Sequence, residues 1–463
     1  MDGRDKAILA ARKAFASGAV RETLARRVAI PSESQTPDGA PALRRYLTDE
    51  MVPDFSALGF ETTIVENPRG AGPMLIAARI EDKGLPTVLG YAHGDVVRGM
   101  DADWHEGLSP WRLETRGDRW YGRGVADNKG QHLINMTALS AVLSTRGRLG
   151  FNAKFIVEMG EEMGSPGLRQ VCESHRDLLK ADLLVASDGP RLSAARPTIF
   201  LGARGGLTFD LTIEAREGGH HSGNWGGLIS NPGIELAHAI ACLVGPTGQI
   251  RVPEFVPPDI PDSVRRVLAD IEVTSTDGGP ALEPHWGEPG LTLAEKVFGW
   301  CNLEVLAFEC GNPRAPMNAI PPRAFARMQL RFVVGVDTEA LLPALRRHLD
   351  RHGFAHVNIA KSRDDMFIAT RIDPDHPHVR FAVESLTRTH GSPPAILPNL
   401  GGSLPNDIFT DVLGLTTIWV PHSYPACSQH APNEHIPISI VEEGLALMAG
   451  LYWDIGEGLP KFS

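Results

Sequence analysis

The chain has 463 residues, of which 42% are hydrophobic and 22% are charged, as in an ordinary globular protein of two or three domains. Its net charge of -11, without a long block of either sign, argues against nucleic acid or an anionic membrane as a partner. The five cysteines are scattered and form no CxxC pair, which argues against a disulfide framework and a cysteine zinc site. No apolar run is long enough for a membrane helix and the N-terminus lacks a signal core, so we expect a cytoplasmic protein.

In the first two hundred residues, hydrophobic periodicity predicts helices and short apolar strands that come to alternate along the chain. The expected helices cover residues 4–30, 42–58, 129–145 and 164–177, and the expected strands cover 60–65, 74–80, 87–92, 151–158 and 181–186. The long segment 98–128 has little periodicity, but its tryptophans argue against disorder. The alternation predicts an α/β fold with a mostly parallel sheet flanked by helices.

The pattern changes near residue 200. The expected strands are then 208–215, 303–310 and 324–334, and the expected helices are 231–244 and 338–352. Few helices separate these strands, which indicates an antiparallel sheet in an α+β module. From residue 376 the first pattern returns, with helices expected over 376–390 and 439–456 and strands over 394–398 and 416–420. We therefore predict one large domain built from residues 1–206 and 376–463, with a smaller domain, 207–375, inserted into it.

Two adjacent carboxylates, Glu161 and Glu162, stand where the apolar strand 151–158 ends. Ligand sites of open α/β sheets lie beyond the carboxyl ends of the strands. Neighbouring side chains on an extended chain point to opposite sides, so the two carboxylates cannot easily share one role. One could hold a metal ion while the other stays free to move a proton. Taken alone, the pair is more typical of a solvent-exposed turn.

Four other segments near predicted strand ends carry acidic or histidine side chains. These are His93 with Asp95, Asp127 in a glycine-lined turn, Asp188 after an apolar strand, and His430 far downstream. Each one alone is more readily explained as a helix cap or a loop residue. Together with the glutamate pair, they would meet at one edge of the sheet. Imidazole and carboxylate ligands without cysteine suit Zn²⁺, and also Mn²⁺ or Co²⁺, and two such metals need a shared carboxylate.

These motifs, in this order and spacing, resemble those of the co-catalytic zinc amidohydrolase and exopeptidase family. That family includes carnosinase, aminoacylase, carboxypeptidase G, acetylornithine deacetylase and succinyl-diaminopimelate desuccinylase. The resemblance covers nearly the whole chain and is closest to the carnosinase-like metallodipeptidases, through segments 197–206, 221–227 and 401–405. It implies two divalent metal ions, with Zn²⁺ preferred and Mn²⁺ or Co²⁺ as alternatives. It also implies a homodimer in which the inserted domain, 207–375, serves as lid and dimerisation domain.

The resemblance implies a role for each residue of the constellation. Asp127 bridges the two metals, and the peptide bond that follows it is often cis in the family. His93 and Asp188 complete one metal site, while Glu162 and His430 complete the other. Glu161 is the general base. Asp95 would orient His93, because a metal-bound imidazole normally donates its other N–H to a carboxylate or carbonyl. An Asp at 188, where several deacylases have Glu, groups the chain with the carnosinase and carboxypeptidase-like members.

The resemblance also implies residues that contact the substrate. His221 would stabilise the oxyanion from the partner subunit, Arg331 would clamp a substrate carboxylate, and Asn318 stands where carnosinases have Thr. From the residues themselves, the run Gly401–Gly402–Ser403 could present backbone N–H groups and a hydroxyl to a carboxylate. Without the resemblance, the pattern around His221 is typical of a surface turn. Arg331 would then belong to a solvent-exposed face of a sheet, and the glycines would form an ordinary turn.

The expected reaction is hydrolysis of an amide or peptide bond in a small, carboxylate-bearing substrate such as a dipeptide. Water between two divalent cations loses a proton near neutral pH and becomes the nucleophile, and Glu161 passes that proton to the leaving amine. An N-acyl-amino-acid deacylase of the aminoacylase or deacetylase type is the alternative. A non-catalytic dimeric binding protein would lack a ligand or the base, and all of these positions are filled. A metallo-phosphoesterase would release phosphate rather than an amine.

Overall fold

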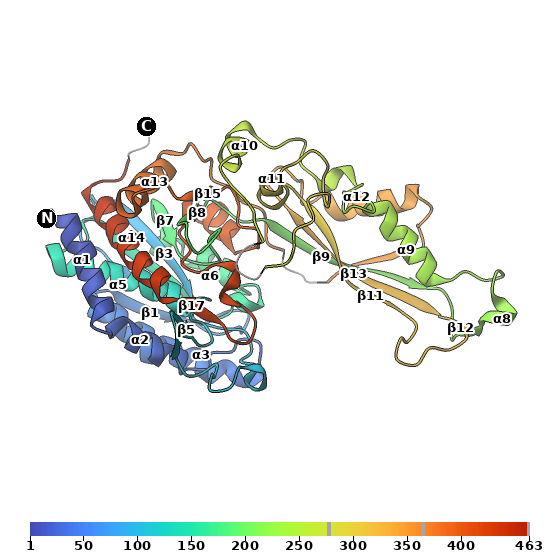
Figure 1. The fold of residues 1–463 in the computed structure, drawn as a ribbon, viewed down its shortest axis with the longest axis horizontal. Coiled ribbons are helices and arrows are strands. Elements are labelled where there is room, and N and C mark those ends of the chain that lie inside the picture. Colours follow the sequence, from blue (N-terminus) through green and yellow to red (C-terminus); the bar gives the residue numbers. More distant parts are fainter. Residues whose placement is uncertain (276–278, 363–365, 461–463) are drawn as a thin grey trace.

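The computed structural model describes residues 1–275, 279–362 and 366–460. Figure 1 shows two parts: a helix-covered part around a large sheet, which holds both ends of the chain, and an elongated part that extends away from it. The predicted fold class, α/β with a helix-flanked sheet and a smaller antiparallel sheet, is confirmed. In the described part of the chain, no helix combines the length and hydropathy needed to span a bilayer.

The large sheet has the strand order β1-β2-β6-β3-β7-β16-β8-β15. Its strands are β1 (Glu61–Val65), β2 (Met74–Arg79), β3 (Thr87–His93), β6 (Asn152–Glu158), β7 (Leu183–Ala186), β8 (Thr198–Phe200), β15 (Ala395–Leu397) and β16 (Thr416–Trp419). The four central strands, β6, β3, β7 and β16, run parallel to one another, so their carboxyl ends lie at the same edge. Antiparallel pairs join β1 to β2, β2 to β6, and β16 to β8.

Both faces of this sheet are buried, which explains its near-continuous apolar strands. On β7, Leu183 and Val185 point into one hydrophobic core, while Leu184 and Ala186 point into another. The first core is closed by helices α1 (Gly3–Ala16), α2 (Ala19–Val28), α5 (Lys129–Arg146), α13 (Pro377–His390) and α14 (Ile438–Glu457). The second is closed by α6 (Leu168–Ser174), α10 (Asp262–Leu268) and α11 (Leu293–Phe298). Helices α1 and α14, from opposite ends of the chain, pack side by side (Figure 1).

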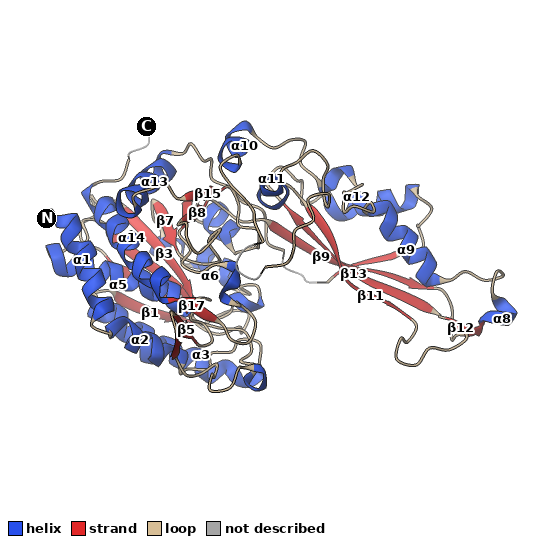
Figure 2. Ribbon diagram, viewed as in Figure 1, coloured by secondary structure: helices blue, strands red, loops and turns tan. Residues whose placement is uncertain are grey.

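The elongated part is built on a second, fully antiparallel sheet of order β11-β13-β9-β14. Its strands are β9 (Gly205–Glu214), β11 (Asn302–Cys310), β13 (Arg323–Phe332) and β14 (Asn358–Lys361). Alternate residues of β9 are buried, as the period of a strand with one covered face requires. Helices α9 (Pro232–Leu243) and α12 (Leu341–Arg351) contribute to the core on that face. The short strands β10 (His220–His221) and β12 (Ala319–Ile320), with α8 (Ser222–Trp225), form the far tip (Figure 2).

Several predicted elements differ in detail from those observed. The helical region 4–30 is two helices, because Gly18 between them adopts a left-handed conformation with φ 86°. The region 42–58 is divided into α3 (Ala40–Arg45), a π-helical turn at 46–51 and α4 (Val52–Ala57). The irregular segment 98–128 contains the hairpin β4 (Glu114–Arg116) and β5 (Arg119–Tyr121), which pairs with β17 (His435–Pro437). The predicted helix 164–177 begins later, at Leu168, and is followed by α7 (Arg176–Leu179).

The positions of the strands along the chain can be compared with the predicted domain boundaries. Strands of the large sheet lie before residue 201 and after residue 394, and strands of the second sheet lie between 205 and 361. Helices α10 and α11 fall within the segment 207–375, yet they pack in the core of the large sheet. The boundaries at 206 and 376 stay a prediction.

Candidate metal centre

The glutamate turn after β6 is held by a buried carboxylate from the neighbouring strand. Beyond β6 the chain forms a single 3-10 turn, Glu161–Met163. The backbone N–H groups of Glu161 and Glu162 donate to the two oxygens of Asp95, each at 3.1 Å. Asp95 follows β3, the parallel neighbour of β6, and is fully buried. This carboxylate therefore fixes the direction in which both glutamates leave the sheet.

Asp95 also contacts His93, but chiefly through its backbone. The Nδ1 atom of His93 lies 3.0 Å from the carbonyl oxygen of Asp95 and 3.5 Å from the carboxylate. Because a carbonyl only accepts, Nδ1 carries a proton, which leaves Nε2 as the atom that could bind a metal. Nε2 lies 3.1 Å from Oδ1 of Asp127 and 3.6 Å from Oδ2 of Asp188. The ligand atoms of these three side chains lie within 4.8 Å of one another.

A second group shares Asp127 with the first. The Nε2 atom of His430 lies 3.1 Å from Oδ2 of Asp127 and 3.0 Å from Oε2 of Glu162. The ligand atoms of Asp127, Glu162 and His430 again lie within 4.8 Å of one another. Asp127 thus offers one oxygen to each group. The structure brings all five predicted ligands together, and their ligand roles stay a prediction.

The position of Asp127 depends on Glu434, a residue that sequence reasoning missed. The buried Glu434 carboxylate accepts from Nη1 of Arg123 at 2.9 Å and from three backbone N–H groups of the turn 124–127 at 2.9–3.1 Å. The next peptide bond, Asp127–Asn128, is cis, as the resemblance implies. The only sequence signal for Glu434 is its closeness to His430, because its partners lie some three hundred residues away.

Negative charge is crowded in this centre. Burial raises the pKa of Glu162 to about 7 and that of Asp188 to about 6. Hydrogen bonds to Asp127 and Glu162 raise the pKa of His430 to about 11. Oδ2 of Asp188 is buried and has no hydrogen-bond partner within the described residues. Divalent cations among these oxygens and imidazoles would offset the cost of burying the carboxylates, so the donor set fits the metals that the sequence predicts.

Glu161 differs from Glu162 in its surroundings. Within the described residues, Glu161 belongs to neither ligand group, whereas Glu162 completes the second. Burial raises the pKa of Glu161 well above that of an ordinary glutamate. Both glutamates line a cavity of about 740 Å³ between the large sheet and the second sheet. A buried carboxylate outside the ligand groups can take up and release a proton beside a bound molecule.

The same cavity contains two of the predicted substrate residues. Arg331, on β13, donates from Nη1 to Oγ of Ser403 at 2.9 Å, and both side chains line the cavity. Gly402 lines a different cavity, of about 830 Å³, and its carbonyl accepts from the backbone N–H of Arg204. An ion pair of Arg169 with Asp407 forms part of the wall of the first cavity and was not predicted. The guanidinium of Arg331, which lines this space, is of a kind that suits a substrate carboxylate.

The other two predicted substrate residues lie elsewhere. His221 ends β10 and its ring accepts from the backbone N–H of Gly223 at 3.1 Å. The carbonyl of Asn318 accepts from the backbone N–H of Ser222 at 2.9 Å, so both residues belong to the tip. Figure 1 shows this tip, at α8 and β12, at the end of the molecule far from the large sheet. Within one chain, His221 and Asn318 are therefore beside each other and away from the metal centre.

The model of peptidase family M20/M25/M40 matches residues 89–454, which include the whole constellation from His93 to His430. The chain belongs to this family. Like other M20 peptidases it is a hydrolase that uses divalent metal, and the predicted family resemblance is confirmed.

Relatives of this M20 peptidase match along nearly its whole length. The Beta-Ala-His dipeptidase of Homo sapiens is 24% identical over 457 residues, which are 94% of this chain and 86% of that protein. The Cys-Gly metallodipeptidase dug1 of Schizosaccharomyces pombe is 24% identical over 475 residues, and the match covers 94% of this chain and 95% of that protein. The structure of the M20 family metallo-carboxypeptidase Sso-CP2 of Sulfolobus solfataricus superposes with a TM-score of 0.79 at 26% identity. The superposition covers 94% of this chain and 99% of that chain.

Proposed function

We propose that this M20 peptidase is a dipeptidase that hydrolyses the amide bond of small peptides with a free carboxylate. The observation that carries the proposal is Asp127, whose two oxygens each meet a separate imidazole–carboxylate group. His93 and Asp188 would complete one metal site and Glu162 and His430 the other, with Zn²⁺ preferred and Mn²⁺ or Co²⁺ as alternatives. The bound cations would supply an acidified water molecule and polarise the amide carbonyl.

Glu161 is the proton carrier in this proposal. Asp95 holds the backbone of the glutamate turn, so the Glu161 carboxylate is presented to the cavity in a fixed direction. Burial raises its pKa, which allows it to accept a proton from water and keep it until the amine leaves. Donation to the amine nitrogen then prevents the leaving group from departing as an unstable anion. Asp95 acts through the turn and through His93 rather than on the substrate.

Arg331 and Ser403 would bind the carboxylate of the substrate. Their side chains already contact each other at 2.9 Å in the cavity wall. A carboxylate that binds both replaces a neutral hydroxyl contact of the guanidinium by a charged one, which is the stronger interaction. Gly402, which precedes Ser403, would donate its backbone N–H to the substrate carboxylate. The names of the two dipeptidase relatives support peptides as substrates, and N-acyl amino acids are the alternative with the same carboxylate.

We also propose that the enzyme is a homodimer formed through the segment 207–375. Strand β11 is the outer strand of its sheet, and it exposes apolar side chains such as Leu306 (53%) and Phe308 (46%). Trp225 and Met317 at the tip are exposed as well. An unpaired apolar edge of this kind is covered in stable proteins. The tip of one subunit would then bring His221 of the partner subunit, with its neighbouring Asn318, to the oxyanion in the other subunit.

The five cysteines are all free thiols, which supports a reducing compartment such as the cytoplasm as the place of action.

The substrate assignment is tested by measuring amine release from the metal-reconstituted enzyme. A library of dipeptides and a matched library of N-acyl amino acids, each with free and amidated carboxyl groups, are compared by kcat/KM. We expect dipeptides with a free carboxylate to be the best substrates. Faster turnover of N-acyl amino acids would replace the dipeptidase by a deacylase, and no amine release from either library would contradict hydrolysis of amides.

A further inference from the structure

A second set of metal-binding side chains lies far from the catalytic centre, on the helical face of the second sheet. Cys242 is in the last turn of α9, and His348 and His352 are in the last turn and cap of α12. The ligand atoms of the three side chains lie within 4.8 Å of one another. Helices α9 and α12 pack against each other in the elongated part of the molecule (Figure 1).

The hydrogen bonds of the two histidines fix which nitrogen of each ring is protonated. Nε2 of His348 lies 2.9 Å from the carbonyl oxygen of Cys242, and Nδ1 of His352 lies 2.8 Å from the carbonyl oxygen of His348. Because carbonyl oxygens only accept, these nitrogens are the donors. The other nitrogen of each neutral ring then carries a lone pair. Metal-binding histidines are oriented in the same way, by donation of the second N–H to a carbonyl or carboxylate.

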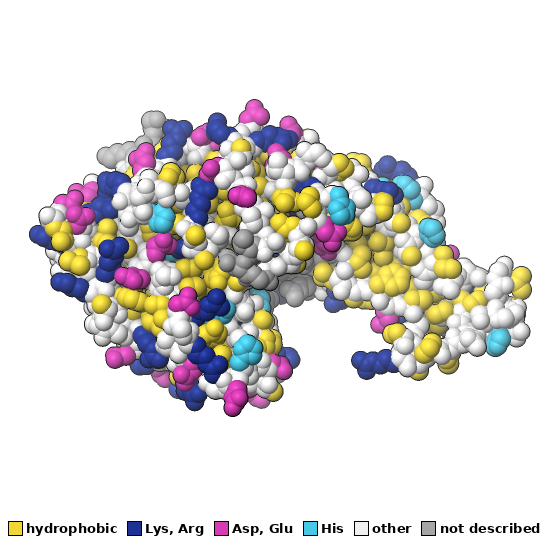
Figure 3. Space-filling model, viewed as in Figure 1, with side chains coloured by type: hydrophobic (Ala, Val, Ile, Leu, Met, Phe, Trp, Pro, Cys, Tyr) yellow, Lys and Arg dark blue, Asp and Glu magenta, His cyan; other side chains and the backbone are white. Residues whose placement is uncertain are grey.

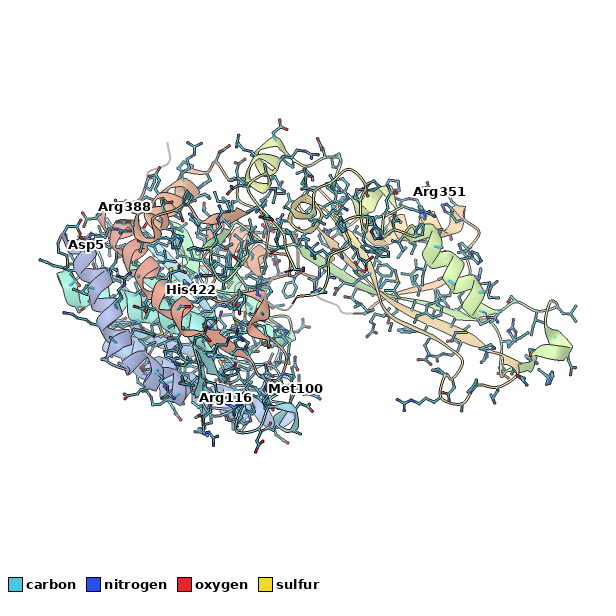
Figure 4. The ribbon with its side chains drawn as sticks, in the orientation of Figure 1. Asp5, Met100, Arg116, Arg351, Arg388 and His422 are labelled. Carbon is cyan, nitrogen blue, oxygen red and sulfur yellow. The ribbon has the colours of Figure 1, made fainter. Side chains whose placement is uncertain are left out.

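The two histidine rings are neighbours at the end of one helix. Residues four apart on a helix lie on the same face, and the rings of His348 and His352 are stacked with centroids 4.3 Å apart. His348 is buried, Cys242 is half-buried and His352 is exposed, so the group is open to solvent on one side. Figure 3 shows histidine side chains at the surface over α12, and Arg351, labelled in Figure 4, marks the end of that helix.

We propose that Cys242, His348 and His352 form a third cation site, for a zinc-like transition metal. One thiolate and two imidazoles suit Zn²⁺ or Co²⁺ far better than Mg²⁺ or Ca²⁺, which prefer oxygen. Three protein ligands leave the fourth tetrahedral position to water or to a side chain of another molecule. The site differs in composition from the catalytic centre, whose predicted ligands include no sulfur.

Binding at this site exchanges a proton for the metal. In the structure the Sγ atom of Cys242 donates to the carbonyl oxygen of Ala239 at 3.0 Å, so the thiol holds its proton. On binding, the S–H bond breaks, the proton leaves to solvent and the sulfur donates a lone pair to the cation. Burial raises the pKa of the Cys242 thiol to about 11 and the nearby positive charge of Arg251 opposes that shift, so the cation itself has to displace the proton. The bound metal would join the ends of two helices that are about a hundred residues apart in the chain.

Titration of the full-length enzyme with Co²⁺ tests this proposal, since sulfur-to-cobalt charge transfer gives an absorption band in the near ultraviolet. We expect a band that saturates at one sulfur-bound Co²⁺ per chain, in addition to cobalt in the catalytic centre. Cys242→Ser should abolish the band. His352→Gln, at an exposed position where folding is not at risk, should weaken cobalt binding at this site by at least about tenfold.

The matched control is Cys310→Ser, which removes another half-buried free thiol and should leave the band unchanged. The proposal is overturned by the absence of a sulfur band in the unmodified enzyme, by a band that survives Cys242→Ser, or by unchanged cobalt affinity in His352→Gln. Turnover of dipeptides is not the readout, so the result is independent of the proposed activity.

Discussion

At the scale of single residues, the centre depends on the difference between two adjacent glutamates. Both line the cavity, but Glu162 completes a group with Asp127 and His430, whereas Glu161 belongs to neither ligand group of the described residues. The buried carboxylate of Asp95 maintains this difference by binding both backbone N–H groups. A change at either glutamate should therefore affect a different property of the enzyme.

Glu161→Gln keeps the size of the side chain but removes its capacity to carry a proton. We expect kcat for the best dipeptide to fall by about 10²- to 10⁴-fold, the usual contribution of a general acid–base group, while the metal content stays unchanged. Glu162→Gln serves as the comparison, and it should lose metal as well as activity. Metal content is measured by mass spectrometry alongside turnover. Normal turnover in Glu161→Gln would remove this residue from the proton transfer.

Arg331→Lys retains the positive charge but loses the paired donors of the guanidinium. We expect kcat/KM for a dipeptide with a free carboxylate to fall by about tenfold or more, because a bidentate charged contact is replaced by a single one. The same dipeptide with an amidated carboxyl group is the control, and its already poor kcat/KM should change little. Equal losses for both substrates would mean that Arg331 does not recognise the carboxylate.

At the scale of elements, the segment between β16 and α14 contains a histidine that the fold keeps neutral. His422 is fully buried, and burial together with the nearby charge of Arg191 holds its pKa well below the ordinary value. Neither ring nitrogen has a hydrogen-bond partner within the described residues. The unfolded chain takes up a proton at this residue below about pH 6.5, and the folded chain does not. The folded state is therefore stabilised above that pH and loses this contribution as the pH falls.

His422→Leu should remove this part of the pH dependence. Below pH 6.5 the unfolding free energy of the unmodified apoprotein should fall more steeply than that of the variant, by up to about 1.4 kcal/mol per pH unit. The measurement is urea unfolding between pH 5 and 8.5, followed by circular dichroism. Above pH 7.5 the two proteins should show parallel curves. Parallel curves over the whole range would mean that His422 takes up protons equally in the folded and unfolded states, and would contradict the lowered pKa.

The sequence alone could point to the five residues that the structure brings together, because each lies in a short local pattern near the end of a strand. The order of the central strands in the sheet could not be predicted from local patterns, since it depends on contacts between segments that are distant in the chain. The contact of Asp95 with the glutamate turn follows from the pairing of β3 with β6, and the contact of Glu434 with the turn 124–127 follows from a loop far downstream. Short strands such as β8 and β14 were missed because three or four residues carry too little periodicity.

At the scale of the whole molecule, the proposed oxyanion residue lies outside the metal centre of its own chain. His221 is in β10, which pairs with β12, and Figure 1 shows β12 and α8 at the tip, far from the large sheet. The exposed apolar edge of β11 favours a second copy as the source of the missing group. Subunit mixing can distinguish this arrangement from one in which each chain acts alone.

Mixing Glu161→Gln with His221→Ala should restore activity that neither variant has. In a mixed dimer, one site combines an intact Glu161 with an intact His221 of the partner subunit, and the other site lacks both. With random exchange, half of the dimers are mixed and half of their sites are active, so we expect about a quarter of the unmodified activity. Turnover is measured after subunit exchange, with each variant alone as the control. An inactive mixture would contradict action between subunits.

The central claim, that Asp127 joins two metal groups in a hydrolytic centre, is tested most directly by counting metals together with turnover. The purified enzyme is analysed by mass spectrometry and assayed with a dipeptide before chelation, after chelation and after addition of Zn²⁺ or Mn²⁺. We expect two divalent cations bound by the catalytic residues of each chain, loss of turnover with their removal, and recovery when they return. Turnover that persists in the metal-free protein, or a metal-loaded protein that hydrolyses no dipeptide, would contradict this account.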